Sequence, residues 1–163
     1  MAVTDTVFFD TSVLLAGLID LGTATAGAQR VMDAVADGRL AAVRTAWHCC
    51  LEFYSVATRL PPELRLTPAD ALRLVETEIL ARIGVDQLPA GSFAEFLRAA
   101  AREPTVGGRI YDAHIAEVAR LGQAHVVVTD NRRHFASLMR YGIRVLTIDE
   151  CAGELPKGPS SVR

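Results

Sequence analysis

Residues 7–15 have the sequence VFFDTSVLL, an apolar run that a single acid, Asp10, interrupts. Such a run is prone to burial, and a buried carboxylate without a partner costs several kcal/mol. The charge therefore needs a counter-charge, a proton or a cation, and a metal ion is the simplest candidate. We accordingly expect Asp10 to be a functional residue at the end of a buried strand.

Outward from this segment, short apolar runs alternate with helical patterns. Strands are predicted over residues 7–9, 40–44, 84–88, 125–129 and 144–148. Helices are predicted over residues 12–18, 24–36, 46–60, 68–82, 91–102, 110–121 and 132–141. Thr45 and Thr67 are expected to cap the third and fourth of these helices. The alternation predicts an α/β fold, a three-layer α/β/α sandwich with a central parallel sheet.

The length of 163 residues fits one domain, expected over residues 1–153, with 154–163 as a loose tail rich in Pro, Gly and Ser. The net charge of −2 gives no overall attraction to nucleic acid, so any polyanion site must be local. No apolar run approaches the ~20 residues of a membrane span, and no signal peptide is recognised. Cys49, Cys50 and Cys151 lack metal-binding spacing, which predicts free thiols in a cytoplasmic protein.

Two acids follow apolar strands of the predicted sheet. Asp10 follows the first strand, and Asp130 follows the apolar segment 126–129 of the fourth. In open α/β sheets, ligands bind beyond the carboxyl ends of the strands, near the point where the strand order reverses. The first and fourth strands would be neighbours at that point, so these two carboxylates are expected to converge.

Two further acids lie on predicted helices. Glu52 is the only acid between Arg44 and Arg59 and stands among apolar neighbours. Taken alone, it fits an exposed helix position or a partner for a core arginine as well as a functional role. Asp112 lies in the first turn of its helix, where the helix dipole alone favours a carboxylate. Their combination with the strand-end acids makes both candidates for a shared site.

Four motifs together resemble the PIN domain and, within it, the VapC-like toxin ribonucleases. They are VFFDTSVLL at 7–15, the lone Glu52, GRIYDAHIA at 108–116 and VVTDNRRHF at 127–135. The resemblance spans nearly the whole chain, and the last two motifs at this separation are its most specific part. It implies a metal-dependent endoribonuclease, the toxin of a toxin–antitoxin pair, with a cognate antitoxin as partner.

By matching motif, Asp10, Glu52 and Asp112 fall on three acidic positions of the family's metal site. Thr11 falls on the hydroxyl residue after the first acid. The resemblance thus implies that the three acids are catalytic and bind the metal, with Thr11 in support.

The fourth position of the metal site is less clear. The family pattern after the fourth strand is Thr, any residue, then Asp or Asn; in that register Thr129 is the supporting hydroxyl and Asn131 the ligand. Asp130 is then the intervening residue. Either Asp130 or Asn131 fits the fourth metal position, and Asp130 is also kept as a catalytic candidate.

The chemistry fits this set of side chains. Mg²⁺ and Mn²⁺ prefer oxygen ligands, and the candidate site offers no soft ones. A phosphodiester is negative, so attack and departure of its oxygens both need positive charge, which metal ions supply. Arg109, Arg132 and Arg133, together with His134, lie next to the acids and are candidate contacts to RNA phosphates.

Two alternatives use the same features differently. Phosphotransfer folds also place an Asp after the first strand, but they need a second adjacent acid and a lysine near the site. Here Thr11 and Ser12 follow Asp10, and the only lysine, Lys157, lies in the tail, which argues against that class. A non-catalytic PIN-like module that binds RNA or protein stays open as the alternative function.

The family also tends to form homodimers. Helices 69–79 and 93–101, rich in Ala and Leu, are candidates for that contact, or they belong to the core. Neither the RNA target nor the number of metal ions follows from the sequence.

Overall fold

Five parallel strands form one sheet in the computed structural model, which describes residues 5–20, 22 and 25–155. The strand order is β3-β2-β1-β4-β5. The strands are β1 (Val7–Phe9), β2 (Val43–Ala46), β3 (Gly84–Asp86), β4 (Val126–Val128) and β5 (Arg144–Leu146). Val7 is in register with Val43 on one side and Val126 on the other. The predicted contact between the first and fourth strands is therefore confirmed, and the strand order reverses there.

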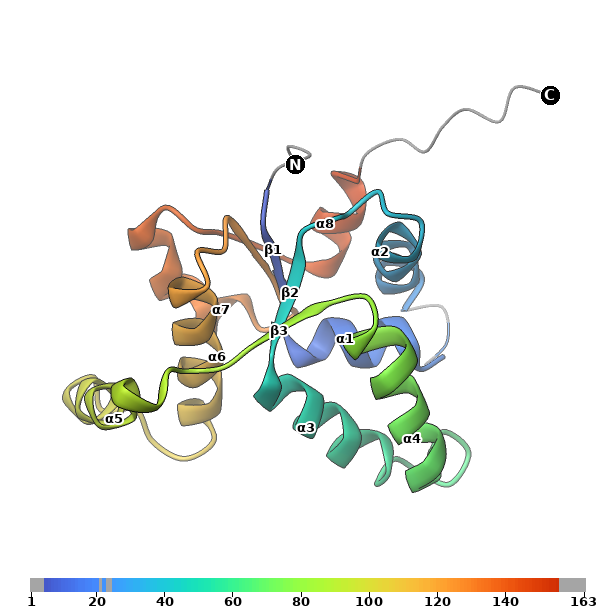
Figure 1. The fold of residues 1–163 in the computed structure, drawn as a ribbon, viewed down its shortest axis with the longest axis horizontal. Coiled ribbons are helices and arrows are strands. Elements are labelled where there is room, and N and C mark those ends of the chain that lie inside the picture. The colour runs from blue at the N-terminus through green and yellow to red at the C-terminus, as the bar shows by residue number, and fades with distance from the viewer. Residues whose placement is uncertain (1–4, 21, 23–24, 156–163) are drawn as a thin grey trace.

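Helices cover both faces of this sheet (Figure 1). On one side lie α6 (Arg109–Leu121) and α7 (Arg132–Phe135), and on the other α1 (Thr11–Leu18), α2 (Ala26–Ala36) and α8 (Ile148–Gly153). The remaining helical elements are α3 (Trp47–Ala57), α4 (Pro68–Leu74), the π-helical turn η2 (Val75–Leu80), the 3₁₀ turn η3 (Ala90–Ser92), α5 (Phe93–Arg102) and the 3₁₀ helix η4 (Ala136–Tyr141). The predicted three-layer α/β/α sandwich is confirmed.

The central strands form the core. Every residue of β1 and β4 is buried, because helices cover the side chains that point to either face of the sheet. This double coverage explains why both strands are continuous apolar runs instead of alternating patterns. Phe8, Phe9 and Phe53 are among the largest fully buried side chains. Burial of each stabilises the fold by about 1.5–3 kcal/mol.

The start of α3 differs from the prediction. The second strand covers Val43–Ala46 instead of 40–44, and α3 begins at Trp47. Thr45 does not cap the helix: it lies inside the sheet, and its hydroxyl donates to the carbonyl oxygen of Phe9 at 2.8 Å. A β-branched residue packs well between strands, and this preference outweighs its capping propensity here. Thr67, in contrast, caps α4 as predicted.

Helix α8 was not predicted. The last strand ends at Leu146, and Thr147 begins a capping box in which its side chain accepts from the Glu150 backbone and the Glu150 carboxylate accepts from the Thr147 backbone. The sequence contains this Thr-x-x-Glu pattern. The strand predicted through residue 148 is therefore too long, because the capping box competes for its end.

Most of the predicted tail lies outside the described residues, which end at Leu155. Of the two tail residues that are described, Glu154 pairs with Arg144 and Leu155 packs against the core. The three cysteines are free and buried, as expected. Among the described residues, no helix has the length and apolar character needed to cross a membrane.

Candidate active site

Asp10 lies directly after β1, at the carboxyl end of that strand, and is only 6% exposed. Its Oδ2 accepts hydrogen bonds from Thr129 Oγ1 at 2.7 Å and from Ser12 Oγ at 3.0 Å. Burial is the largest influence on this carboxyl and raises its pKa. The hydrogen bonds from Thr129, the Thr11 backbone and Ser12 lower the pKa by less. The negative charge of Asp112 raises it further, which indicates that the two acids lie in the same region.

The two hydroxyls that bind Asp10 are themselves held by the chain after β4. The backbone N–H of Asp130 donates to Ser12 Oγ at 3.1 Å, and that of Asn131 donates to Thr129 Oγ1 at 3.0 Å. Each hydroxyl has a single proton to donate. Because its oxygen already accepts a hydrogen bond from a backbone N–H, the hydroxyl donates this proton to the carboxylate. Two backbone amides thus orient two hydroxyls toward one oxygen of Asp10.

Glu52 joins the same region from α3. Its Oε2 accepts a hydrogen bond from Thr11 Oγ1 at 2.6 Å, and its side chain is half-buried. Neither a fully exposed helix position nor a buried arginine partner accounts for it. One turn earlier on α3, burial raises the pKa of the Cys49 thiol to about 12, so this cysteine stays protonated beneath the site.

Asp112 lies in the first turn of α6 and contacts the chain after β4. Its Oδ2 is 2.6 Å from His134 Nδ1. Asn131 Nδ2 is 2.6 Å from the same nitrogen. The structure therefore places Asn131 on the same side as Asp112, with His134 between them.

Asp130 has a different environment from the other candidate acids. Its side chain is exposed, and its carboxylate lies near the backbone N–H of Ile148, at the start of α8. Partial burial is the main influence and raises its pKa, the Ile148 N–H lowers it, and the charge of Asp149 raises it. The structure places Asp10, Glu52, Asp112 and Asn131 in one region through the intermediates Thr11, Thr129 and His134, whereas the Asp130 carboxylate lies near α8.

A cavity of about 470 Å³ opens beside Asp112 and His134, between α5, α6 and η4. Arg109 and Arg133 lie on its wall. Neither forms an ion pair with any other residue in the described part of the chain. The other two arginines of the wall are paired with glutamates. Positive charge that is available to a phosphate therefore lies at the end of the cavity next to the acids.

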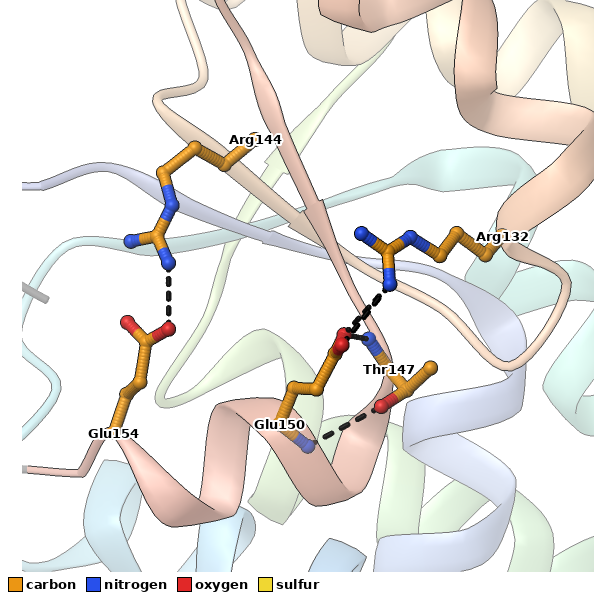
Figure 2. A network of polar contacts seen from close by, with 5 residues as sticks. All are labelled: Arg132, Arg144, Thr147, Glu150 and Glu154. Atoms are coloured by element: carbon orange, nitrogen blue, oxygen red, sulfur yellow. Dashed lines mark hydrogen bonds and ion pairs between the residues drawn. The ribbon is translucent and has the colours of Figure 1, made fainter.

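Arg132, the third predicted RNA contact, points toward α8 (Figure 2). Its Nη1 lies 3.0 and 3.2 Å from the two carboxylate oxygens of Glu150, the residue that closes the capping box with Thr147. Arg132 thus fastens the start of α7 to α8. Its charge is partly neutralised in this arrangement.

The acids of the candidate site have the donor chemistry for a divalent cation but are not arranged around one point. Among the residues that the structure describes, no three acidic, histidine or cysteine side chains surround one point closely enough to hold a metal ion. Each carboxylate instead has a local partner: hydroxyls for Asp10, Thr11 for Glu52 and His134 for Asp112. The donor chemistry does fit, because all three carboxylates are hard oxygen ligands. Asp10, whose pKa is raised by burial and by the charge of Asp112, would gain most from a nearby cation.

Two participants were missed from the sequence. Ser12 binds Asp10, and the only indication is a second hydroxyl residue directly after Thr11. His134 was expected to contact phosphates but pairs with Asp112, a contact that depends on the packing of α7 against α6.

Comparisons with known proteins agree with this architecture. A sequence model of the PIN domain matches residues 6–133, which include the four candidate acids Asp10, Glu52, Asp112 and Asp130. Ribonuclease VapC27 of Mycobacterium tuberculosis (strain ATCC 25618 / H37Rv) is 36% identical over 85 residues. The match covers 52% of this chain and only 60% of that protein.

Two solved structures have a similar fold. FitAcB from Neisseria gonorrhoeae superposes with a TM-score of 0.56 at 19% identity, covering 87% of this chain and 97% of that one. FitAB bound to an IR36 DNA fragment superposes with a TM-score of 0.57 at 17% identity, covering 87% of this chain and 94% of that one. At these identities the likeness shows a shared fold.

Proposed function

Because the chain belongs to the PIN domain family and is VapC-like, we propose that it is a divalent-metal-dependent endoribonuclease that hydrolyses RNA phosphodiester bonds. The observation that carries the proposal is the buried Asp10 carboxylate, held by two oriented hydroxyls at the carboxyl end of the sheet. The cavity beside Asp112, on whose wall Arg109 and Arg133 form no ion pair among the described residues, suits a polyanion.

In this proposal Asp10, Glu52 and Asp112 hold Mg²⁺ or Mn²⁺. Asn131 is the proposed fourth ligand in place of Asp130, supported by its position beside His134 and Asp112. A bound divalent ion supplies positive charge to the attacking and leaving oxygens and lowers the pKa of a water molecule.

The remaining residues position this set. Thr129 and Ser12 fix the orientation of Asp10, and Thr11 fixes that of Glu52. Such outer hydrogen bonds set the direction in which a ligand presents its oxygens. Arg109 and Arg133 bind the phosphates on either side of the reacting one, at the end of the cavity where their charge is unpaired.

We further propose that the protein is the toxin of a toxin–antitoxin pair, acts in the cytoplasm and forms a homodimer. Similarity to a VapC ribonuclease supports the toxin assignment. Exposed Leu72, Phe93 and Leu97, on the two helices predicted for subunit contact, support the dimer. Native purification with mass determination tests both, since recovery as a lone monomer without a small copurifying chain contradicts them.

The activity is tested with purified, partner-free protein and a mixed RNA pool in Mg²⁺, Mn²⁺ or EDTA. We expect cleavage with either metal, none in EDTA and none by Asp112→Asn. Asp37→Asn, which alters an exposed acid at the end of α2, is the matched control and should cleave like the wild type. A folded wild type that binds RNA but cuts none in either metal would favour the non-catalytic binding module.

A further inference from the structure

We propose that the stacked rings of His48 and Tyr111 form a platform that binds an unpaired nucleobase of the substrate beside the reacting phosphate. The inference rests on the proposed ribonuclease function and adds a determinant of substrate choice to it. The platform predicts that efficient cleavage requires an unpaired base, in single-stranded or looped RNA, at one fixed position relative to the cut.

The platform adjoins the candidate site from two helices. The rings of His48 and Tyr111 are 5.0 Å apart with an interplanar angle of 15°. His48 lies one turn before Glu52 on α3, and Tyr111 immediately precedes Asp112 on α6. Tyr111 is 55% exposed, so much of its surface is open to a ligand. A base stacked there would lie next to the acids.

Aromatic neighbours hold the platform from behind. The ring of His114 meets His48 edge-on at 5.7 Å and 63°, and Phe96 of α5 meets His114 at 5.7 Å and 81°. Within the described part of the chain, the buried Nδ1 of His114 has no hydrogen-bond partner, so ring packing fixes this row. A platform fixed before binding loses little freedom when a base stacks on it.

A nucleobase is the occupant that these surroundings favour. Single-stranded RNA is recognised by stacking of splayed bases on aromatic side chains, which tolerates many sequences. The unpaired Arg109 lies in the same turn as Tyr111, where it meets the backbone of a strand whose base is stacked. The apolar residues Trp47, Leu51 and Tyr54 lie on a different face of α3, and a protein partner fits that face better.

The test uses single-stranded RNAs that the wild type cuts, each with one abasic nucleotide at a successive position around the cut. In the wild type, the abasic nucleotide at one position should lower kcat/KM by about 5- to 150-fold, the range for loss of one stacked base. Tyr111→Ala should show that loss on intact RNA and no further loss on the abasic RNA. Tyr111→Phe should keep the wild-type pattern, and so should the control Tyr54→Ala.

Anisotropy titrations of the same oligomers in EDTA measure the platform without cleavage. A wild type that cuts no RNA refutes the proposed function, and the platform is then judged on these dissociation constants alone. The platform is overturned if Tyr111→Ala retains the wild-type abasic penalty, or if no position shows a penalty. A changed oligomeric mass of Tyr111→Ala with an unchanged penalty overturns it in favour of a protein contact.

Discussion

Asp10 and Asp130 follow two neighbouring parallel strands, β1 and β4, yet their carboxylates face different parts of the molecule. Asp10 is buried and accepts hydrogen bonds from two hydroxyls, and the charge of Asp112 raises its pKa. Asp130 is exposed, and its carboxylate lies near the backbone N–H of Ile148 at the start of α8. Two acids at the ends of neighbouring strands therefore have different environments, because their side chains lie in different directions.

The largest expected effect is the loss of RNA cleavage when the charge of Asp10 is removed. Asp10→Asn should lower RNA cleavage by about 100-fold or more, since an amide removes the charge that a divalent ion requires. Without metal the variant should unfold at the same or a higher temperature, because the buried charge is removed with little change in volume. If the variant unfolds at a much lower temperature than the wild type, its loss of activity reflects misfolding.

Thr129→Val tests the hydroxyl that orients Asp10. Loss of one outer hydrogen bond to a metal ligand typically costs about 10- to 100-fold in metal affinity or activity, and we expect a loss in that range here. The Asn131 backbone N–H also loses its acceptor, so thermal unfolding should move to lower temperature. Thr129→Ser keeps the hydroxyl and is the control. Equal losses in both variants would show that packing, and not the hydrogen bond, is what matters.

Asn131→Asp sharpens the comparison by adding a carboxylate on the Asp112 side of the loop. An added charge close to a bound cation contributes about 1 kcal/mol or more, so Mn²⁺ should bind roughly fivefold tighter or better in calorimetry. Asp130→Asn removes a charge on the other side and should leave the affinity almost unchanged. The opposite pattern would identify Asp130 as the ligand.

Asp130→Ala should affect stability more than chemistry. A negative charge near the Ile148 N–H at the start of α8 is lost, which should cost about 0.3–1 kcal/mol in the free energy of unfolding. Cleavage should stay within about threefold of the wild type, as for other surface substitutions. Urea unfolding measures the first effect, and Asp130→Asn, which keeps an acceptor oxygen, should reduce it. Unaltered stability in the alanine variant would contradict the contact with α8.

The smallest effect concerns Glu150, which fastens α8 to the same loop. The Thr147 backbone hydrogen bond, and then Arg132, hold the pKa of this carboxyl below its usual range. A depressed folded-state pKa stabilises the fold above the unfolded-state pKa, and this stabilisation is lost as the pH falls through the folded value. The difference in unfolding free energy between the wild type and Glu150→Gln should therefore shrink on acidification. A difference that grows at low pH would contradict the assignment.

Much of the fold follows from local pattern. The apolar runs of β1 and β4 predict buried parallel strands, and their adjacency places Asp10 at the switch point. The second strand was misplaced because the hydroxyl of Thr45 suits a cap and a sheet equally well in sequence terms. Helix α8 has only six residues, too few for a periodic pattern, so its capping box was the sole indication.

The direction of a single side chain was beyond sequence reasoning. Asp130 and Asn131 are adjacent, and which of them faces Asp112 depends on the backbone after β4. That segment is fixed by tertiary contacts, namely the Asp130 N–H bond to Ser12 and the ion pair of Arg132 with Glu150 on α8. The register of the family motif places Asn131 at the fourth position, and whether Asn131 or Asp130 is the ligand stays a prediction.

The most direct test of this account measures RNA cleavage by Asp10→Asn and Asp130→Asn in parallel, with one RNA substrate and saturating Mg²⁺ or Mn²⁺. The two substitutions make the same chemical change at the ends of neighbouring strands. We predict that Asp130→Asn cleaves like the wild type, whereas Asp10→Asn is inactive although folded. Equal loss of cleavage in both variants, or full cleavage by Asp10→Asn, would contradict the account.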